Sequence, residues 1–543
     1  MDIYLEIFPF LGVIVMFKRN CQPFLLTSPT VFLFIFFVFL ILFFYQPLEI
    51  EDGWWHLSTA RWMVEHGGVP HQDIFPFEHE TKAWSYTQWL GSVIFYFFYK
   101  LGGMTGLKAF RAFILALAVI LFIFYARRKI RIPVLIVLSL FLAHGLAPRC
   151  LLRPLIFNYI FIQIVLMILL SYLKDGTKKI LWLLPVMGLV WDNIHLGSFI
   201  YGAPLIGLAG GILGAEYFCR TFIKKEKTGR LKTMRSQSLD ILKIGLIYLL
   251  VFFINPYGIQ GGFYPWKVFS FSDSIHFYKF SRIIEEMQSP LVLWGSAQGA
   301  LFFILFILGL VSVMKIQKNR WPLVAWWLYS VLIFSKGVQG GAFFVVVTLY
   351  VVVEWIQEKT LSLKSDLTDS LLRLERVFVV VMMLLIGGKI IGMLPKGILA
   401  QGRLVRSISL DFRAPHPVRA VEFLRKNRIA GKVFNDEKFG GFLIWTSYPD
   451  LKPFIDGRQV YPERYFEDYL GVMRDPDENW PVLQKKYQFD LILLDKTWAL
   501  SQRFTQYLNL SQDWKLIFSD EYSLVYVPAG IPVEPLRLNH RRN

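Results

Sequence analysis

The chain has 543 residues, of which 55% are hydrophobic and 18% are charged, and its mean hydropathy is +0.45. Soluble domains contain roughly 45–50% apolar and about 25% charged residues, so this composition excludes an ordinary soluble protein. The formal net charge is +18, but residues 397–543 carry only +3 of it (21 Lys and Arg against 18 Asp and Glu). The remaining +15 lies with the apolar part, where cytoplasmic connectors require it, and it does not indicate a nucleic-acid partner.

The first 30 residues contain an apolar stretch, Ile3–Phe17, without a basic n-region or a small-residue cleavage site. Three interpretations fit this N-terminal segment: a signal-like region, a mis-assigned start, or a helix at the membrane interface.

Residues 31–396 contain long apolar runs that alternate with short basic connectors. Val31–Tyr45, for example, reads VFLFIFFVFLILFFY and has no charge. A helix needs about 20 apolar residues to cross roughly 30 Å of hydrocarbon. We therefore predict an α-helical polytopic membrane protein of about 11–13 transmembrane helices. The eleven assigned spans cover residues 31–46, 107–126, 132–147, 155–173, 179–191, 196–219, 240–255, 291–314, 321–335, 338–357 and 376–395.

The connectors indicate the orientation of these spans. Residues 220–239 contain seven Lys and Arg and one acid, which is typical of a cytoplasmic loop. Four more basic connectors fall on the same side: 126–131, 174–179, 315–320 and 357–376. The N-terminus is then cytoplasmic, and the apolar segment Trp89–Leu101 must lie along the outer interface. The outer connectors are 47–106, 148–154, 192–195, 255–290, 336–337 and the tail after Pro395.

Residues 397–543 form the predicted outer domain, because apolar runs give way there to short strands and amphipathic helices. Strands are expected at 432–435, 442–445, 453–456, 491–495, 516–519 and 523–527. Helices are expected at 417–427, 463–473, 480–487 and 499–510. This alternation predicts an α/β domain with a mixed sheet. None of the three cysteines (Cys21, Cys150, Cys219) falls in it, which excludes a disulfide framework or a cysteine metal site there.

The first outer connector, residues 47–106, is the strongest candidate for chemistry. It begins with the adjacent acids Glu51 and Asp52, followed by Trp54, Trp55 and His56. An acid at the membrane surface beside tryptophans suits a lipid-borne substrate, as a general base or as a ligand to a divalent cation. A structural alternative is that Asp52 caps a helix over 53–66, which Gly67 ends, and that the tryptophans anchor at the interface.

Other outer connectors offer partners for these acids. Residues 192–195 contain Asp192 and His195, and residues 255–290 end with Glu285 and Glu286. Bases at the same depth could bind a lipid phosphate, or equally contact headgroups and cap helices; they are Arg149, Arg153 and Lys336.

The order of these features resembles the GT-C class of membrane glycosyltransferases, which includes oligosaccharyltransferase catalytic subunits and protein mannosyltransferases. The run EDGWWHLSTARWMVEHGGVPHQDIFPF, followed by WSYTQWLGSVIFYFFYKLGG, is similar to the first outer loop of bacterial members. IIEEMQSP resembles the short glutamate motif of oligosaccharyltransferases, with Glu286 as the better match, and Asp192 is an approximate counterpart of the second acidic motif. The segment around 438–442 stands where oligosaccharyltransferases carry Trp-Trp-Asp-Tyr-Gly, but that motif is missing. We therefore do not predict protein N-glycosylation.

The resemblance implies transfer of a sugar from a polyprenyl-phosphate donor to an acceptor on the outer face of a bacterial inner membrane, in one inverting displacement. Asp52 would be the base, helped by Glu51, Glu286 and Asp192, and a divalent cation (Mg²⁺ or Mn²⁺) would bind Asp52 and Glu286. Donor and acceptor would contact Trp54, Trp55, His56, Arg149, Arg153, His195, Glu285 and Lys336.

Two other classes remain open from the sequence. In one, the chain is a non-catalytic relative whose outer domain binds a cell-envelope partner. In the other it is a transporter, although transporters usually place charges near the membrane midplane and contain paired halves.

Overall fold

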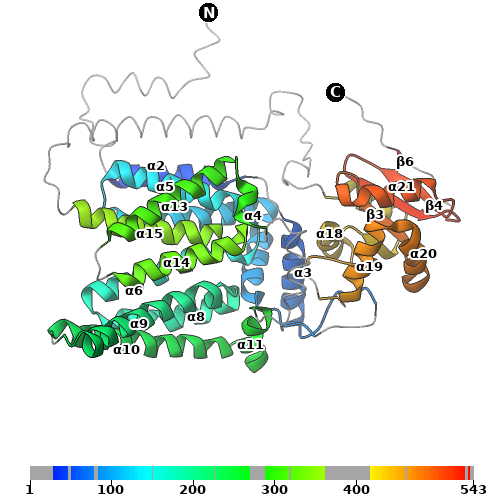
Figure 1. Ribbon diagram of the computed structural model, residues 1–543. Helices are drawn as coiled ribbons and strands as arrows, with labels where there is room; N and C mark the ends of the chain where they lie inside the picture. The colour runs from blue at the N-terminus through cyan, green and yellow to red at the C-terminus, as the bar shows by residue number, and fades with distance from the viewer. Residues whose placement is uncertain are drawn as a thin grey trace, which may run out of the picture.

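The computed structural model describes residues 29–46, 50–78, 83–149, 151–226, 228–269, 288–316, 320–360, 416–458, 460–461, 463–531 and 536–537. Over these ranges the chain forms a bundle of long helices and a smaller α/β domain that lies beyond one end of the bundle (Figure 1). Predictions for residues 1–28 and for the span 376–395 lie outside the described residues.

Ten helices form the body of the bundle in the described part of the chain. They are α2 (Pro29–Phe44), α4 (Trp89–Ala126), α5 (Ile132–Leu146), α6 (Asn158–Asp175), α8 (Leu183–Ile194), α9 (Ala203–Phe218), α10 (Gly229–Leu250), α13 (Ala297–Lys315), α14 (Trp321–Lys336) and α15 (Gly341–Thr360). Shorter helical segments extend or join them: η1 (Ala147–Arg149), η2 (Pro154–Phe157), α7 (Lys178–Leu181), η3 (Ser198–Gly202), η4 (Cys219–Ile223), η5 (Val251–Phe253), α11 (Gly258–Phe269), η8 (Pro290–Leu293) and η9 (Val338–Gly340).

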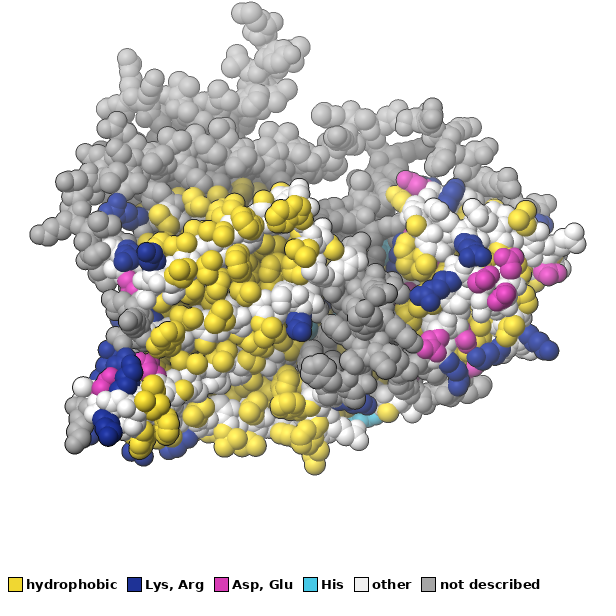
Figure 2. Space-filling model, in the orientation of Figure 1, with side chains coloured by type: hydrophobic (Ala, Val, Ile, Leu, Met, Phe, Trp, Pro, Cys, Tyr) yellow, Lys and Arg dark blue, Asp and Glu magenta, His cyan; other side chains and the backbone are white. Residues whose placement is uncertain are grey.

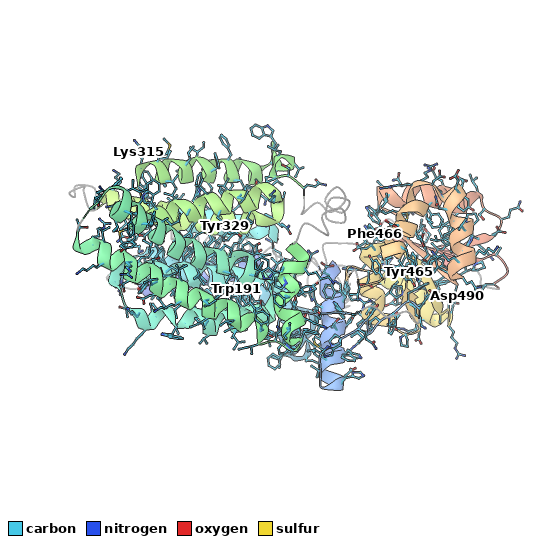
Figure 3. All side chains as sticks on the ribbon, turned by 60° about the horizontal axis from the view of Figure 1, so that its bottom comes forward. Trp191, Lys315, Tyr329, Tyr465, Phe466 and Asp490 are labelled. Atoms are coloured by element: carbon cyan, nitrogen blue, oxygen red, sulfur yellow. The ribbon has the colours of Figure 1, made fainter. Side chains whose placement is uncertain are left out.

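The bundle is a multi-pass membrane structure, as the sequence predicts. Within the described ranges, six helical stretches are long and apolar enough to cross a membrane: Trp89–Ala126, Pro154–Asp175, Ser198–Ile223, Gly229–Phe253, Ala297–Lys315 and Val338–Lys359. The flank of the bundle carries a broad apolar surface, whereas Lys and Arg side chains gather at the end farthest from the α/β domain (Figure 2). Lys315 marks this far end, and Tyr465, Phe466 and Asp490 lie in the α/β domain (Figure 3).

Several boundaries differ from the prediction, and two of them change how a segment is assigned. The span expected at 240–255 belongs to α10, which starts eleven residues earlier, so part of the basic connector 220–239 is helical. The charges of that first stretch had suggested a loop, but they lie on the exposed side of a helix whose other side buries Leu231, Met234 and Ser238. The segment Trp89–Leu101 is the first part of α4, which is interrupted by non-helical backbone at Gly102 and Gly103. Gly103 has φ = 58°, a left-handed conformation that glycine adopts without a steric penalty.

Helix α3 (Glu51–His66) stands between the bundle and the α/β domain and runs across the end of the bundle (Figure 1). It ends at Gly67, which has φ = 68° and whose N–H bonds to the Met63 carbonyl, as expected for a glycine cap.

The α/β domain contains a six-stranded mixed sheet with the order β2-β1-β3-β5-β4-β6. Its strands are β1 (Gly431–Asn435), β2 (Leu451–Pro453), β3 (Leu491–Asp495), β4 (Trp514–Ser519), β5 (Ser523–Pro528) and β6 (Leu536–Arg537). Strands β1, β2 and β3 pair in parallel, while β5 pairs antiparallel to β3 and β4. The helices are α17 (Val418–Lys426), α18 (Glu437–Ser447), α19 (Glu463–Arg474), α20 (Pro476–Tyr487) and α21 (Gln502–Leu510), with the short η11 (Ala499–Ser501).

One predicted strand of this domain is shifted, since β2 covers Leu451–Pro453 rather than 453–456, and another is wrong. Residues 442–445 belong to α18, not to the sheet. A short apolar run does not distinguish a buried strand from a buried helix, so packing decides. Here α18 packs against α3 and against the segment after β2, where a Cβ on Gly440 would lie 2.2 Å from the Ile455 carbonyl oxygen. Only glycine permits this approach of the two backbones.

Candidate functional site

Close backbone contacts bring three of the predicted outer connectors together at one end of the bundle. A Cβ on Gly53 in α3 would lie 3.2 Å from the Leu152 carbonyl oxygen. A Cβ on Gly91 in α4 would lie 2.7 Å from Pro154 and 3.1 Å from the Ile194 carbonyl oxygen. The start of α3, the segment before η2 and the end of α8 therefore converge, as the sequence predicts for connectors 47–106, 148–154 and 192–195.

Asp52 and Arg153 form the centre of this site. Arg153 Nη2 lies 2.8 Å from Asp52 Oδ2, and the two side chains are 27% and 23% exposed, so solvent or a ligand can reach both. Asp52 Oδ1 accepts a hydrogen bond from Trp55 Nε1 at 3.1 Å. The two residues come from different connectors, and their pairing gives an exposed carboxylate a defined position.

The helix-capping alternative for Asp52 is wrong. Helix α3 begins at Glu51 and its N-cap is Ile50, which makes no side-chain capping bond. Asp52 lies inside the first helical turn, where a carboxylate is favoured by the helix dipole but satisfies no cap.

Aromatic rings line one side of Asp52. Trp55 stacks on His56 with ring centroids 3.7 Å apart, and Tyr86 lies 5.7 Å from Trp55 and 4.8 Å from Trp84. Trp55 and Tyr86 are 8% and 3% exposed, so this wall is mainly a packed layer beside the charged pair.

His56 is buried behind this wall. Its Nδ1 lies 2.5 Å from Tyr86 Oη and 2.9 Å from Ser92 Oγ. Burial lowers the pKa of His56 well below its ordinary value, and the charge of Arg153 and the nearby His195 lower it further. His56 is therefore a neutral hydrogen-bonding group at physiological pH.

His195 follows α8 and is also neutral. Its Nδ1 accepts from the Gly197 N–H at 2.9 Å and lies 3.2 Å from Asn158 Nδ2. Burial lowers the pKa of His195 to about 4. Trp191 Nε1 donates to Asn158 Oδ1 at 2.7 Å, which fixes the amide and, through it, the imidazole.

The α/β domain covers the site with the loop 456–458. A Cβ on Gly457 would lie 2.3 Å from Asp52 Oδ1, so this loop touches the carboxylate directly. The loop is held by a group that we name the Arg458 clasp: Arg458, Asp456 and Asp73. Arg458 Nη1 lies 2.5 Å from Asp73 Oδ1, and its Nε and Nη2 each donate to an Asp456 oxygen at 2.8 Å. The clasp is almost fully buried and joins the domain to the first outer connector.

Trp54 joins the same two parts of the molecule. It is 3% exposed, and its ring contacts His416, Phe442 and Trp445 of the α/β domain. Trp54 therefore lies in the interface between α3 and the α/β domain.

Of the other predicted site residues, two lie apart from Asp52 and four are described only in part or not at all. Asp192 is buried at the end of α8 and accepts from Ser198 Oγ at 2.8 Å, and Lys336 is the exposed last residue of α14. Among described contacts, neither is joined to Asp52. Glu51 and Arg149 lie in α3 and η1, where only their backbones are described. Glu285 and Glu286 lie outside the described residues.

The described carboxylates do not assemble a cation site. No group of three or more His, Cys, Asp or Glu side chains suited to a metal occurs in the described ranges. Both Asp52 oxygens already accept from Arg153 and Trp55. The expected second ligand, Glu286, is not described, so Mg²⁺ or Mn²⁺ binding stays a prediction.

Sequence reasoning missed Asp73, Tyr86 and Ser92, and it gave Asp456-Gly457-Arg458 as either a turn or a ligand-facing loop, without a partner for Arg458. Asp456-Gly457-Arg458 reads first as a turn, and nothing local connects it to Asp73, 385 residues away. The only feature of the sequence that could have indicated this contact is an acid, Asp73, in one predicted outer segment and a base, Arg458, in another.

The geometry defines a membrane bundle with an accessible carboxylate–arginine pair at one end, under a C-terminal α/β domain. No family model and no curated protein matches the sequence. Two solved structures of oligosaccharyltransferases are similar in fold. The chain aligns with Archaeoglobus fulgidus AglB in complex with an inhibitory peptide and a dolichol-phosphate at TM-score 0.50 and 11% identity, covering 85% of this chain and 69% of that one. It aligns with the Archaeoglobus fulgidus enzyme tethered with an acceptor peptide containing the NVT sequon at TM-score 0.51 and 13% identity, covering 92% and 75%. The chain therefore has a GT-C-like oligosaccharyltransferase fold, as expected from its sequence.

Proposed function

We propose that the chain is a membrane glycosyltransferase that moves a sugar from a polyprenyl-phosphate-linked donor to an acceptor hydroxyl or amine on the outer face of a bacterial inner membrane. The observation that carries the proposal is the accessible Asp52–Arg153 pair beside an aromatic wall. The fold shared with AglB, whose complex contains a dolichol-phosphate, supports a lipid-linked donor.

The residues suggest how the groups would act. Arg153 would bind the donor phosphate, because a guanidinium matches phosphate oxygens in a bidentate manner. That exchange would release Asp52 Oδ2 to accept the proton of the acceptor. The acceptor then attacks the anomeric carbon, the bond from that carbon to the phosphate oxygen breaks, and Arg153 stabilises the leaving phosphate. One displacement inverts the anomeric centre. A divalent cation shared by Asp52 and Glu286 would add to the charge stabilisation.

The test measures transfer from radiolabelled polyprenyl-phosphate sugars by purified full-length protein. Asp52→Asn keeps the shape of the side chain and removes the base, so we expect transfer to fall about 10²- to 10⁴-fold. Glu65→Gln is the matched control, since Glu65 is exposed on the same helix, and it should retain full transfer. Equal transfer by Asp52→Asn, or no transfer by the wild type with any donor, would favour a non-catalytic protein that binds an envelope partner.

A further inference from the structure

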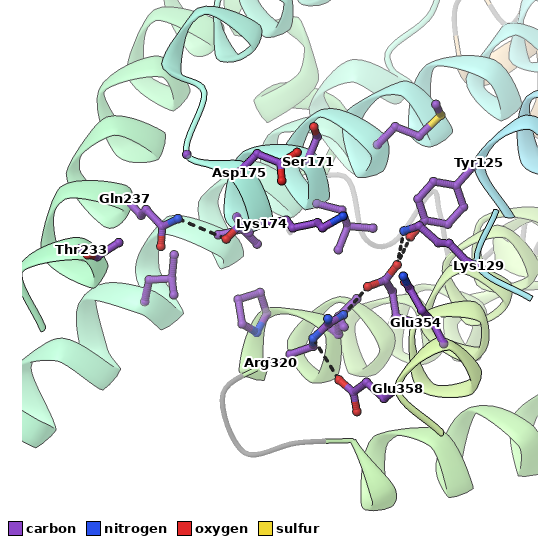
Figure 4. A pocket seen from close by; sticks show the side chains of 18 of the residues that line it. Tyr125, Lys129, Ser171, Lys174, Asp175, Thr233, Gln237, Arg320, Glu354 and Glu358 are labelled. Atoms are coloured by element: carbon purple, nitrogen blue, oxygen red, sulfur yellow. Dashed lines mark hydrogen bonds and ion pairs between the residues drawn. The ribbon is translucent and has the colours of Figure 1, made fainter. Parts of the chain in front are cut away.

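A second cavity lies at the opposite end of the bundle from Asp52. It has a volume of about 980 Å³ and is lined by the ends of α4, α6, α9, α10, α14 and α15 (Figure 4). Helix α6 runs from beside the outer site to this cavity in 18 residues, which is about 27 Å at 1.5 Å per residue. The two sites are therefore separated by approximately the thickness of the hydrocarbon core.

Each of the five basic connectors contributes to this one cavity. The lining residues include Arg128, Lys174, Arg230, Arg320 and Glu358, one from each connector. The structure thus confirms that the five connectors meet at one end of the bundle. By the positive-inside rule this end faces the cytoplasm.

Part of the charge in the cavity is already neutralised. Glu354 is buried and accepts hydrogen bonds from Tyr125, Lys129 and Arg320, and Arg320 Nε also lies 3.0 Å from Glu358 Oε1 (Figure 4). These two bases and two acids form a fixed wall between α4, α14 and α15. Glu216 is paired with Arg220 at 2.7 Å.

The remaining charge is positive. Of the lining residues, Arg128, Lys174 and Arg230 are exposed and form no ion pair with an acid in the described ranges, while Asp175 is the remaining acid. Three bases against one acid give the mouth of the cavity a net charge of +2, which favours an anionic ligand.

The walls below these bases are apolar. Met167 and Leu170 on α6 line the cavity, and Met167 precedes Lys174 by seven residues, or about 10 Å along the helix. The buried Leu213 and Leu323 complete this deeper part. A ligand that fills both parts has an anionic head and a hydrocarbon segment.

We propose that this cavity binds the phosphate headgroup of an anionic membrane lipid, with Arg128, Lys174 and Arg230 around the phosphate and the start of the acyl chain against the apolar wall. Basic pockets between transmembrane helices on the cytoplasmic side suit such headgroups. The site does not depend on glycosyl transfer.

Native mass spectrometry of the purified full chain, titrated with phosphatidylglycerol or with phosphatidylcholine of the same acyl chains, tests the proposal. We expect clear preference for phosphatidylglycerol. Because each base near a phosphate contributes about fivefold in affinity, the combined Arg128→Gln, Lys174→Gln and Arg230→Gln variant should bind roughly a hundredfold more weakly. The matched control replaces three exposed bases near the same end that do not line the cavity: Lys179→Gln, Lys232→Gln and Arg235→Gln.

Equal loss of binding in the two triple variants would overturn the proposal, since it would indicate general surface charge. Complete displacement of the lipid by millimolar inorganic phosphate would also overturn it, because the site would then recognise a free anion. If the triple variant does not fold, Lys174→Gln alone should lower the affinity about fivefold, and an unchanged affinity would contradict the assignment.

Discussion

The two ends of the bundle each hold a carboxylate next to an arginine, but they differ in burial. At the end that holds Asp52, the side chains of Asp52 and Arg153 are both about a quarter exposed. At the other end, the Glu354 side chain is 5% exposed and is shared by Lys129, Arg320 and Tyr125. An exposed pair is worth little to stability and can exchange partners, whereas a buried, multiply bonded carboxylate cannot. The difference in burial separates a pair that can exchange partners at the Asp52 end from a fixed ion-pair cluster at the Glu354 end.

The same difference in burial occurs between two neighbouring groups around Asp52. The Arg458 clasp has side chains that are 2–6% exposed, yet it lies next to the accessible Asp52 through Gly457. A rigid ionic anchor beside an exchangeable pair is the arrangement expected of a site that must keep its geometry while its charges are in use.

The largest effect should come from breaking the clasp. Arg458→Ala leaves the carboxylates of Asp73 and Asp456 buried without their cation, and removing one partner of a buried pair costs about 3–5 kcal/mol. Thermal unfolding of the purified protein should show a large loss of stability. Lys432→Ala is the control, because the Lys432–Glu78 pair also joins the domain to the first outer connector but is about one-third exposed. It should cost about 1 kcal/mol or less. Similar losses in both variants would contradict the distinction between anchor and surface pair.

A smaller effect, on the rate of glycosyl transfer, should come from displacing the Asp52 carboxylate without removing it. In Gly457→Ala, the added methyl would lie 2.3 Å from Asp52 Oδ1, so Asp52 or the loop must move. A shift of about 1 Å in a catalytic group can lower the rate about a hundredfold. Glycosyl transfer should fall by this factor with little change in thermal unfolding. Gly530→Ala, where the methyl meets nothing within 4 Å, should leave transfer unchanged. Full glycosyl transfer by Gly457→Ala would show that the α/β domain does not hold Asp52 in position.

Much of the fold was predictable because it follows from local patterns. Apolar runs predicted the membrane helices, and alternation predicted β1, β3 and β5 close to their observed bounds. The failure at residues 442–445 has a physical reason. Glycine lowers helix propensity, but at Gly440 the contact with Ile455 requires it, and a single sequence does not show that contact.

The site was predictable in part. Asp52, Arg153 and His195 were each expected in outer connectors, and the structure brings these connectors together. The partner of each residue was not predictable. Asp73 pairs with Arg458 because of the way the α/β domain packs on the first connector. A sequence does not show which charges pair when they are 385 residues apart.

The smallest effect concerns the pH dependence of the outer end. The native pKa of His195 is about 4, below its ordinary value near 6.5, so the unfolded chain takes up a proton first as the pH falls. Its contribution to stability is therefore complete above about pH 6.5 and is lost as the pH falls towards 4, about 2 kcal/mol between pH 7 and 5. His195→Asn keeps an acceptor near the Nδ1 position and removes the titrating group, so its thermal stability should fall less steeply with acid than that of the wild type. His66→Asn, at an exposed histidine of α3, should keep the wild-type slope. If His195→Asn also keeps it, protonation of this imidazole does not weaken the outer end, and the contact of Nδ1 with the Gly197 N–H is not what holds that loop.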